Sequence, residues 1–365
     1  MDHFFTHISS RAIELVEQTL RSTRVSEGSL VARFEELLSS RLGLANPIAV
    51  NSGTSALHLA LDVCGVGPDD EVILAPQTFV ATGLAVLMQR ARPVFADINP
   101  ETGNIDAARL GEKVSERTRA IMAVHWAGYP CDLDEINSIA NEHNIPVIED
   151  AAHALGATYK GRPVGTISRM TCFSFQAIKH LTTGDGGALC CLNSGDALAA
   201  RKGRWFGIDR QRDLPDHLGE RVYDLTRLGY KYHMNDLAAA LGIGNLEDFS
   251  GQLARRREIC ARYRARLAGT DGLRMLNYSQ DRESAWWLFT VLVDSRDSFI
   301  RKLVSHQIQA SVVHRRIDRH SVFGGVAKDL VGQTYFDEHQ VSLPCHPGLS
   351  DQDVEHVSNV VSSGW

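Results

Sequence analysis

The segment Thr171–Cys191 reads TCFSFQAIKHLTTGDGGALCC. It consists of an apolar run, a turn with a single lysine, a glycine-rich loop and a second apolar run, which predicts that Lys179 lies between two buried strands. A lysine amine is a poor nucleophile until burial or nearby positive charge lowers its pKa. The segment therefore indicates a lysine that forms a Schiff base, and the carbonyl partner would have to come from a cofactor.

Pyridoxal phosphate (PLP) is the cofactor that this arrangement favours. Besides the lysine, PLP requires a carboxylate beside its ring nitrogen, an anion-binding site for its phosphate and an apolar side chain against its ring. The sequence offers a candidate for each requirement.

Upstream of this segment, short β-branched runs alternate with helical stretches. We expect strands at 48–50, 71–74, 93–95, 120–124, 146–148, 170–175 and 188–192, with helices at 55–64, 78–89 and 132–143. This alternation predicts an α/β fold with a mostly parallel sheet covered on both faces. Ligands of such sheets gather at the carboxyl ends of the strands.

Three expected strand ends carry the candidate groups. The run 51–54, Asn-Ser-Gly-Thr, joins a strand to a helix and offers free amides, hydroxyls and a positive dipole end for a phosphate, although a simple N-cap would also explain it. Phe79 opens the next helix, where it could face a ligand or the core. Asp150 ends an apolar strand, where it could pair with a protonated pyridine nitrogen or cap the following helix.

The two ends of the chain differ from this pattern. Helices are expected at 10–20, with Ser10 as N-cap, and at 30–42, ended by Gly43. A further helix is expected after Asn235 or Asp236, and a long arginine-rich helix from Asp248 is interpreted as a solvated face rather than an anion-binding patch. Past Gly272, strand-like runs at 286–293 and 310–313 flank a helix at 298–307. We therefore predict a large α/β domain over 1–247 and a smaller α+β domain over 248–365.

Composition narrows the class of protein. The 365 residues, 44% of them hydrophobic, suffice for a large core, and a formal net charge of −6 argues against a nucleic-acid partner. No run of 18 apolar residues exists and the N-terminus MDHFFTH lacks signal-peptide features, so we expect a cytoplasmic protein without a membrane partner. Seven scattered cysteines without a Cys-x-x-Cys pair suggest neither a disulfide framework nor a metal site.

Taken together, these motifs resemble the DegT/DnrJ/EryC1/StrS family of PLP-dependent sugar aminotransferases, within the fold-type I aspartate aminotransferase superfamily. The resemblance covers nearly the whole chain, and its order and spacing are specific. It rests on segments 28–35, 51–57, 76–82, 149–153, 174–175, 179, 182–187, 229–242 and 343–347.

The resemblance implies a role for each matching position. Lys179 is implied as the Schiff-base lysine and general acid/base, and Asp150 as the partner of the pyridine nitrogen. The other implied cofactor contacts are Phe79 against the ring, His153 at the ring hydroxyl, and Gly53, Thr54 and Ser174 at the phosphate. Asn235 matches a residue lent to the cofactor phosphate of the neighbouring subunit, which implies a homodimer with shared active sites.

The implied reaction moves the amino group of L-glutamate, or glutamine, onto a nucleotide-linked keto-deoxy-sugar, with pyridoxamine 5'-phosphate as the intermediate form of the cofactor. A PLP-dependent sugar dehydratase is an alternative, although such members have histidine in place of Lys179. A non-catalytic regulatory member of the family is another alternative, because fold does not fix function.

Two positions depart from the family pattern. His233 stands where many relatives have Arg or Lys, so a charge there would be missing or pH-dependent. The segment 314–320 resembles the substrate loop of the family only in outline, and within it His320 is the candidate sugar contact, the alternative being a surface histidine.

Overall fold

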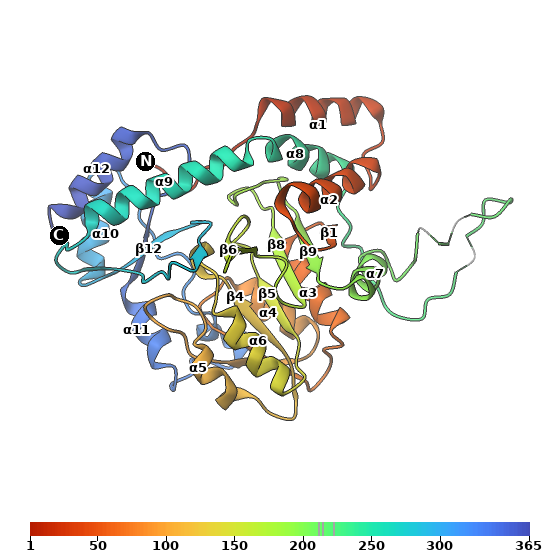
Figure 1. Cartoon of the computed structure of the whole chain (residues 1–365), viewed down its shortest axis with the longest axis horizontal. Coiled ribbons are helices and arrows are strands. Elements are labelled where there is room, and N and C mark those ends of the chain that lie inside the picture. Colours follow the sequence, from red (N-terminus) through yellow and green to blue (C-terminus); the bar gives the residue numbers. More distant parts are fainter. Residues whose placement is uncertain (211, 214, 222) are drawn as a thin grey trace.

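A seven-stranded sheet forms the centre of the molecule in the computed structural model, which describes residues 1–210, 212–213, 215–221 and 223–365 (Figure 1). Its strands, in spatial order, are β1 (Pro47–Val50), β9 (Gly187–Cys191), β8 (Met170–Ser174), β5 (Val147–Asp150), β4 (Thr118–Val124), β2 (Glu71–Leu74) and β3 (Arg92–Phe95). Strand β9 is antiparallel to both of its neighbours, whereas the other pairings are parallel. The predicted mostly parallel sheet is confirmed, and the seven strands expected upstream of residue 193 lie within two residues of the observed bounds.

Helices cover both faces of this sheet, as predicted. Alternate residues of β4 illustrate the two faces: Ala120 and Met122 belong to one buried cluster, whereas Ile121 and Ala123 belong to another. The first face carries α3 (Gly53–Val63), α4 (Val80–Met88) and α7 (Ser194–Gly203), and the second carries α2 (Ser29–Leu42), α5 (Ala107–Leu110), α6 (Leu133–Glu142) and α8 (Asp236–Leu246).

The C-terminal part of the chain has a sheet and a core of its own. The long helix α9 (Phe249–Leu267) leads to it across the molecule in Figure 1. The three antiparallel strands there lie in the order β10 (Leu273–Met275), β12 (Phe289–Val293) and β13 (Gln340–Leu343), accompanied by α10 (Arg296–Ser305), α11 (Val331–His339) and α12 (Asp351–Ser362). The predicted domain boundary at 247/248 falls between α8 and α9. The amino terminus also lies against this part, because the ammonium of Met1 donates to Gln307 O at 2.8 Å.

Several local predictions need correction. The N-cap of α1 (Ser10–Ser22) is Ser9, whose hydroxyl accepts from the Ala12 amide, rather than Ser10. The expected strand 310–313 is reduced to a single bridge between Ser311 and Ser342. The expected strand 286–293 begins only at Phe289, since Trp286 has the left-handed φ of 54°. A small sheet of β11 (Arg282–Glu283), β6 (Thr158–Tyr159) and β7 (Arg162–Pro163) was not predicted.

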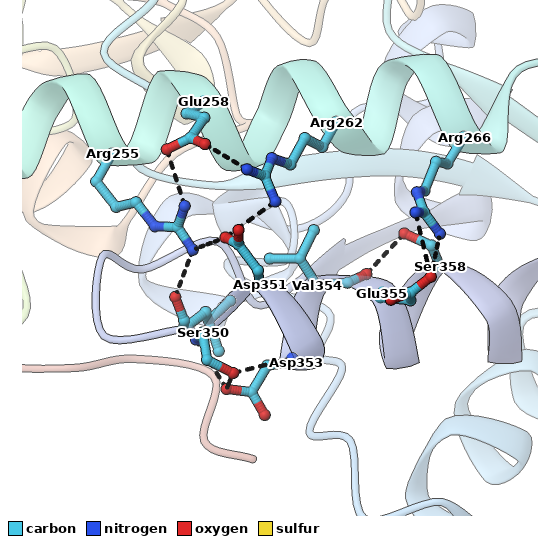
Figure 2. A network of polar contacts seen from close by, with 11 residues as sticks. Arg255, Glu258, Arg262, Arg266, Ser350, Asp351, Asp353, Val354, Glu355 and Ser358 are labelled. Carbon is cyan, nitrogen blue, oxygen red and sulfur yellow. Dashed lines mark hydrogen bonds and ion pairs between the residues drawn. The ribbon is translucent and has the colours of Figure 1, made fainter.

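The arginine-rich face of α9 joins α12 through ion pairs, which Figure 2 shows. Arg255 and Arg262 both contact Asp351, at 2.8 and 2.9 Å, and Arg266 contacts Glu355 at 3.2 Å. Exposed pairs of this kind are screened by solvent, so each contributes little to stability. These guanidinium groups are occupied by carboxylates of the same chain, so they fix the orientation of two helices rather than form an open anion-binding patch.

Within the described ranges, no helix combines the length and the apolar character that crossing a membrane requires.

Close packing of α1 on α8 depends on a glycine. A Cβ added to Gly244 would lie 2.3 Å from the Cα of Ala12, so we expect Gly244→Ala to destabilise the fold by about 1–3 kcal/mol. Gly251→Ala in α9 is the matched control, because nothing lies within 4 Å of its added Cβ and alanine favours a helix interior by about 0.5–1 kcal/mol. Thermal unfolding midpoints at one scan rate should fall for the first variant and not for the second; an unchanged midpoint for Gly244→Ala would contradict the packing argument.

Candidate active site

A cavity of about 340 Å³ opens at the carboxyl ends of the parallel strands. The ends of β4, β5 and β8 contribute Val124, Asp150 and Ser174 to its wall. The start of α3 contributes Gly53, and the loop after β2 contributes Phe79. The cavity thus gathers seven of the nine predicted site residues, namely Gly53, Thr54, Phe79, Asp150, His153, Ser174 and Lys179. The structure does not bring Asn235 or His320 to it.

Lys179 faces the cavity from the turn after β8. Its amide donates to the Gln176 carbonyl at 2.8 Å, and its Nζ lies 3.5 Å from the ring centroid of Trp287. The indole of Trp287 is itself tied to this turn, because its Nε1 donates to Ile178 O at 3.0 Å. Burial lowers the pKa of Lys179 to about 7, although the nearby charge of Asp150 acts in the opposite direction. A large share of the amine is therefore unprotonated near neutral pH, as a nucleophile requires.

Asp150 is buried at the tip of β5. Its Oδ2 accepts from the Thr82 hydroxyl at 2.7 Å, and its Oδ1 accepts from the Ala152 amide at 3.2 Å. Burial raises the pKa of Asp150, and these two hydrogen bonds oppose that rise. Residues 151–157 form turns and not a helix, so the alternative role as a helix cap does not apply. A positively charged group in the cavity would favour the ionised carboxylate.

The neighbouring carboxylate, Glu149, faces away from the cavity. Its Oε2 lies 2.8 Å from His125 Nε2, and its Oε1 accepts from the Ser168 amide at 2.9 Å. The Cys131 amide donates to His125 Nδ1 at 3.1 Å, so Nε2 carries the ring proton and donates it to Glu149. This buried pair anchors the tip of β5 from the opposite face of the sheet.

The start of α3, beside β8, has the features of an anion-binding site. Ser52 caps the helix, its hydroxyl accepting from the Ser55 amide at 3.0 Å, so the amides of Gly53 and Thr54 precede the first intrahelical hydrogen bonds. A Cβ on Gly53 would lie 2.9 Å from the Cβ of Ser174, so glycine is needed for this close approach. Two free amides, nearby hydroxyls and the helix dipole suit a phosphate group.

Two ring residues complete the predicted set. Phe79 is 53% exposed, and its ring centroid lies 5.0 Å from that of His314 at the cavity wall. His153 is buried against Trp287, with ring centroids 3.8 Å apart and planes at 17°. Burial holds the pKa of His153 well below its usual value, and its Nδ1 is buried without a hydrogen-bond partner. A buried polar atom of this kind fits a ligand oxygen.

Sequence reasoning missed Trp287 and His314. Trp287 was expected only as part of a strand, and strand patterns do not show which side chain reaches a distant lysine. His314 lies six residues before His320, the candidate chosen from the same segment, yet His314 lines the cavity whereas His320 is exposed outside it.

Asn235 and His233 lie away from the cavity. Asn235 is exposed and caps α8, its side-chain oxygen accepting from the Ala238 amide at 2.9 Å. His233 is half-buried against Trp205, with ring centroids 4.2 Å apart, and burial lowers its pKa. The lowered pKa favours the uncharged form of His233 at neutral pH.

The residues present fit pyridoxal phosphate. A desolvated lysine and a buried carboxylate face one cavity, a glycine-dependent helix start suits the phosphate, and His153 offers an unpartnered ring nitrogen. On this sheet topology the set defines a fold-type I PLP-dependent transferase. The chain belongs to the DegT/DnrJ/EryC1/StrS aminotransferase family, whose family model matches residues 6–362.

Individual relatives agree with this assignment. AtS13 from Actinomadura melliaura is 40% identical with a TM-score of 0.95, covering 100% of this chain and 99% of that chain. The sugar aminotransferase CalS13 from Micromonospora echinospora is 35% identical with a TM-score of 0.95, covering 100% of both chains. A Streptococcus pneumoniae protein, solved in its PLP form, is 28% identical with a TM-score of 0.92, and the match covers 100% of this chain and 98% of that chain. GDP-perosamine synthase from Caulobacter vibrioides is 34% identical over 91% of this chain and 89% of its own length.

Competitive acetylation of the PLP-free protein tests the environment of Lys179. The labelling rate of Lys179 should reach its plateau about one pH unit above 7, whereas the labelling of Lys160, whose pKa is raised by the hydrogen bond to Asp134, should still rise above pH 10. Asp150→Asn removes the charge that raises the pKa of Lys179, so the midpoint should move to lower pH. Mass spectrometry of the digested protein gives both rates, and a Lys179 profile like that of Lys160 would contradict the burial argument.

Proposed function

We propose that the protein is a PLP-dependent aminotransferase that moves the amino group of L-glutamate, or glutamine, onto a nucleotide-linked keto-sugar. The observation that carries the proposal is the desolvated amine of Lys179 facing the buried carboxylate of Asp150 in one cavity. The names of two relatives, a sugar aminotransferase and GDP-perosamine synthase, support a nucleotide-linked sugar as the acceptor.

The binding residues have separate tasks in this proposal. The amides of Gly53 and Thr54 and the hydroxyl of Ser174 would hold the phosphate of PLP, and Phe79 would pack on its ring. Asp150 would hold the positive ring nitrogen, because a carboxylate in a low-dielectric site gains strongly from an adjacent cation. Bound in this way, PLP supplies an electron sink for the charge that develops on the amino-acid carbon.

Lys179 would act as the general acid and base. Because the pKa of Lys179 lies at about 7, Nζ can accept a proton from the α-carbon of the amino donor and release it again without a large energetic penalty in either direction. The same atom would run the reverse proton transfer when the keto-sugar enters. The π face of Trp287, 3.5 Å from Nζ, stabilises the protonated form between these transfers.

A spectrum of the PLP-loaded protein before and after L-glutamate tests the amino-donor half of the reaction. We expect a visible band that gives way to the near-ultraviolet band of pyridoxamine phosphate. Lys179→Ala should lose the visible band and reduce turnover at least 10³-fold, on the order of what general acid–base catalysis contributes, while far-ultraviolet circular dichroism stays unchanged. Lys160→Ala, which replaces an exposed lysine, is the matched control. Full turnover by Lys179→Ala would overturn the proposal.

We further propose that the enzyme works as a homodimer in which Asn235 serves the cofactor phosphate of the neighbouring subunit. The exposure of Asn235 outside the cavity of its own chain supports this arrangement. The proposed cytoplasmic location stays a prediction.

Subunit mixing tests the shared site. Asn235→Asp retains a capping oxygen for α8 but places a negative charge against a phosphate, so it should be inactive without unfolding. A mixed dimer combines one Asn235→Asp subunit with one Lys179→Ala subunit. The site that keeps Lys179 would receive the intact Asn235 of the Lys179→Ala subunit, so one of the two sites is restored. Mixing should therefore recover about a quarter of wild-type activity at statistical exchange. Mixed dimers seen by native mass spectrometry without any recovery would exclude sharing through Asn235.

A further inference from the structure

His314 has a backbone conformation that residues other than glycine rarely adopt. Its φ is 52°, and such a left-handed conformation costs on the order of 1–3 kcal/mol and persists only where the surroundings enforce it. Two buried glutamines enforce it here, because Gln77 Nε2 and Gln340 Nε2 both donate to the His314 carbonyl, at 2.8 and 3.1 Å.

These glutamines connect three distant parts of the chain. Gln77 follows β2, Gln340 begins β13, and Gln333 of α11 donates from Nε2 to Gln77 Oε1 at 2.8 Å. The backbone amide of Gln333 in turn donates to Asp97 Oδ1 at 2.8 Å. The position of His314 is therefore fixed by the docking of the C-terminal elements on the central sheet.

The imidazole that this scaffold presents faces the cavity. Its ring is nearly parallel to those of His153 and Trp287, at 13° and 18°, with centroids 5.7 and 5.8 Å away, and it lies beside Phe79. In the described part of the chain, no hydrogen bond joins a protein group to either ring nitrogen of His314. Burial, together with the charge of Lys179, lowers the pKa of His314 to about 3. The ring is therefore neutral at working pH, with one nitrogen that donates and one that accepts.

We propose that His314 is a substrate-contacting residue whose neutral imidazole hydrogen-bonds an oxygen next to the reacting carbon, and that Gln77, Gln333 and Gln340 are its positioning residues. The oxygen would belong to the α-carboxylate of the amino donor in the first half of the reaction. This inference rests on the proposed function. A ring that served packing alone would gain nothing from two unpaired nitrogens at the wall of a cavity, and backbone strain without an internal hydrogen bond to the ring indicates a role toward a ligand.

The probe is α-methyl-L-glutamate, which has no α-hydrogen for Lys179 to remove and therefore binds without amino transfer. Its dissociation constant follows from an absorbance titration of the PLP-loaded protein. His314→Phe keeps an aromatic ring and removes both nitrogens, so we expect about two- to tenfold weaker binding. His314→Asn keeps a donor and an acceptor and tolerates a left-handed backbone, so it should stay closer to wild type than His314→Phe.

The opposite order would overturn the inference. If His314→Phe binds the probe like wild type while His314→Asn is impaired, the ring serves packing alone. His306→Asn, at the exposed end of α10, is the matched control and should change nothing. If the wild-type protein itself neither binds the probe nor converts L-glutamate, the proposed function fails and the inference falls with it.

A double-mutant comparison tests the positioning role. Gln340→Leu removes one donor to the His314 carbonyl and should weaken probe binding by itself, in a protein that still retains PLP. Combined with His314→Phe, it should add little, because both changes act through the same contact. Full additivity of the two effects would show that Gln340 supports the fold rather than the placement of His314.

Discussion

The active site depends on the desolvation of two opposite charges at one edge of the sheet. Burial pushes the pKa of Asp150 up and that of Lys179 down, so each group is moved toward its neutral form. Neither shift would arise at a water-filled strand end. The apolar clusters on both faces of the sheet provide this burial. The pKa values of the site therefore depend on the packing of the core.

The C-terminal part of the chain covers this edge of the sheet and shields it from solvent. The amides of Ala285 and Trp287 donate to the carbonyls of Gly128 and Ala127, at 3.0 and 2.9 Å, just after β4. Gly128 has a φ of +95°, and a Cβ there would lie 2.9 Å from the Trp286 amide nitrogen, so glycine lets the two segments meet. This contact places Trp287 over Lys179. The lysine environment is thus assembled from segments more than a hundred residues apart.

The site residues that could be predicted from the sequence are those whose positions depend on local structure. Strand ends place Asp150, Phe79 and the start of α3 on one edge of a parallel sheet, and apolar periodicity is enough to find those ends. Trp287 and His314 could not be found in this way, because their positions depend on left-handed backbone at Trp286 and His314 and on distant carbonyl contacts. Local rules also gave the wrong N-cap for α1, since Ser9 and Ser10 have the same capping chemistry.

The histidines of the cavity matter because they are neutral. His153 and His314 both have lowered pKa values, for which burial is the main cause and the charge of Lys179 a second one. A protonated imidazole beside Lys179 would lower the pKa of the amine further and weaken it as a base. Neutral rings avoid this competition, since near pH 7 they neither release nor take up the proton that the lysine must move. They still offer one donor and one acceptor each, so the cavity can bind polar groups while proton transfer stays with Lys179.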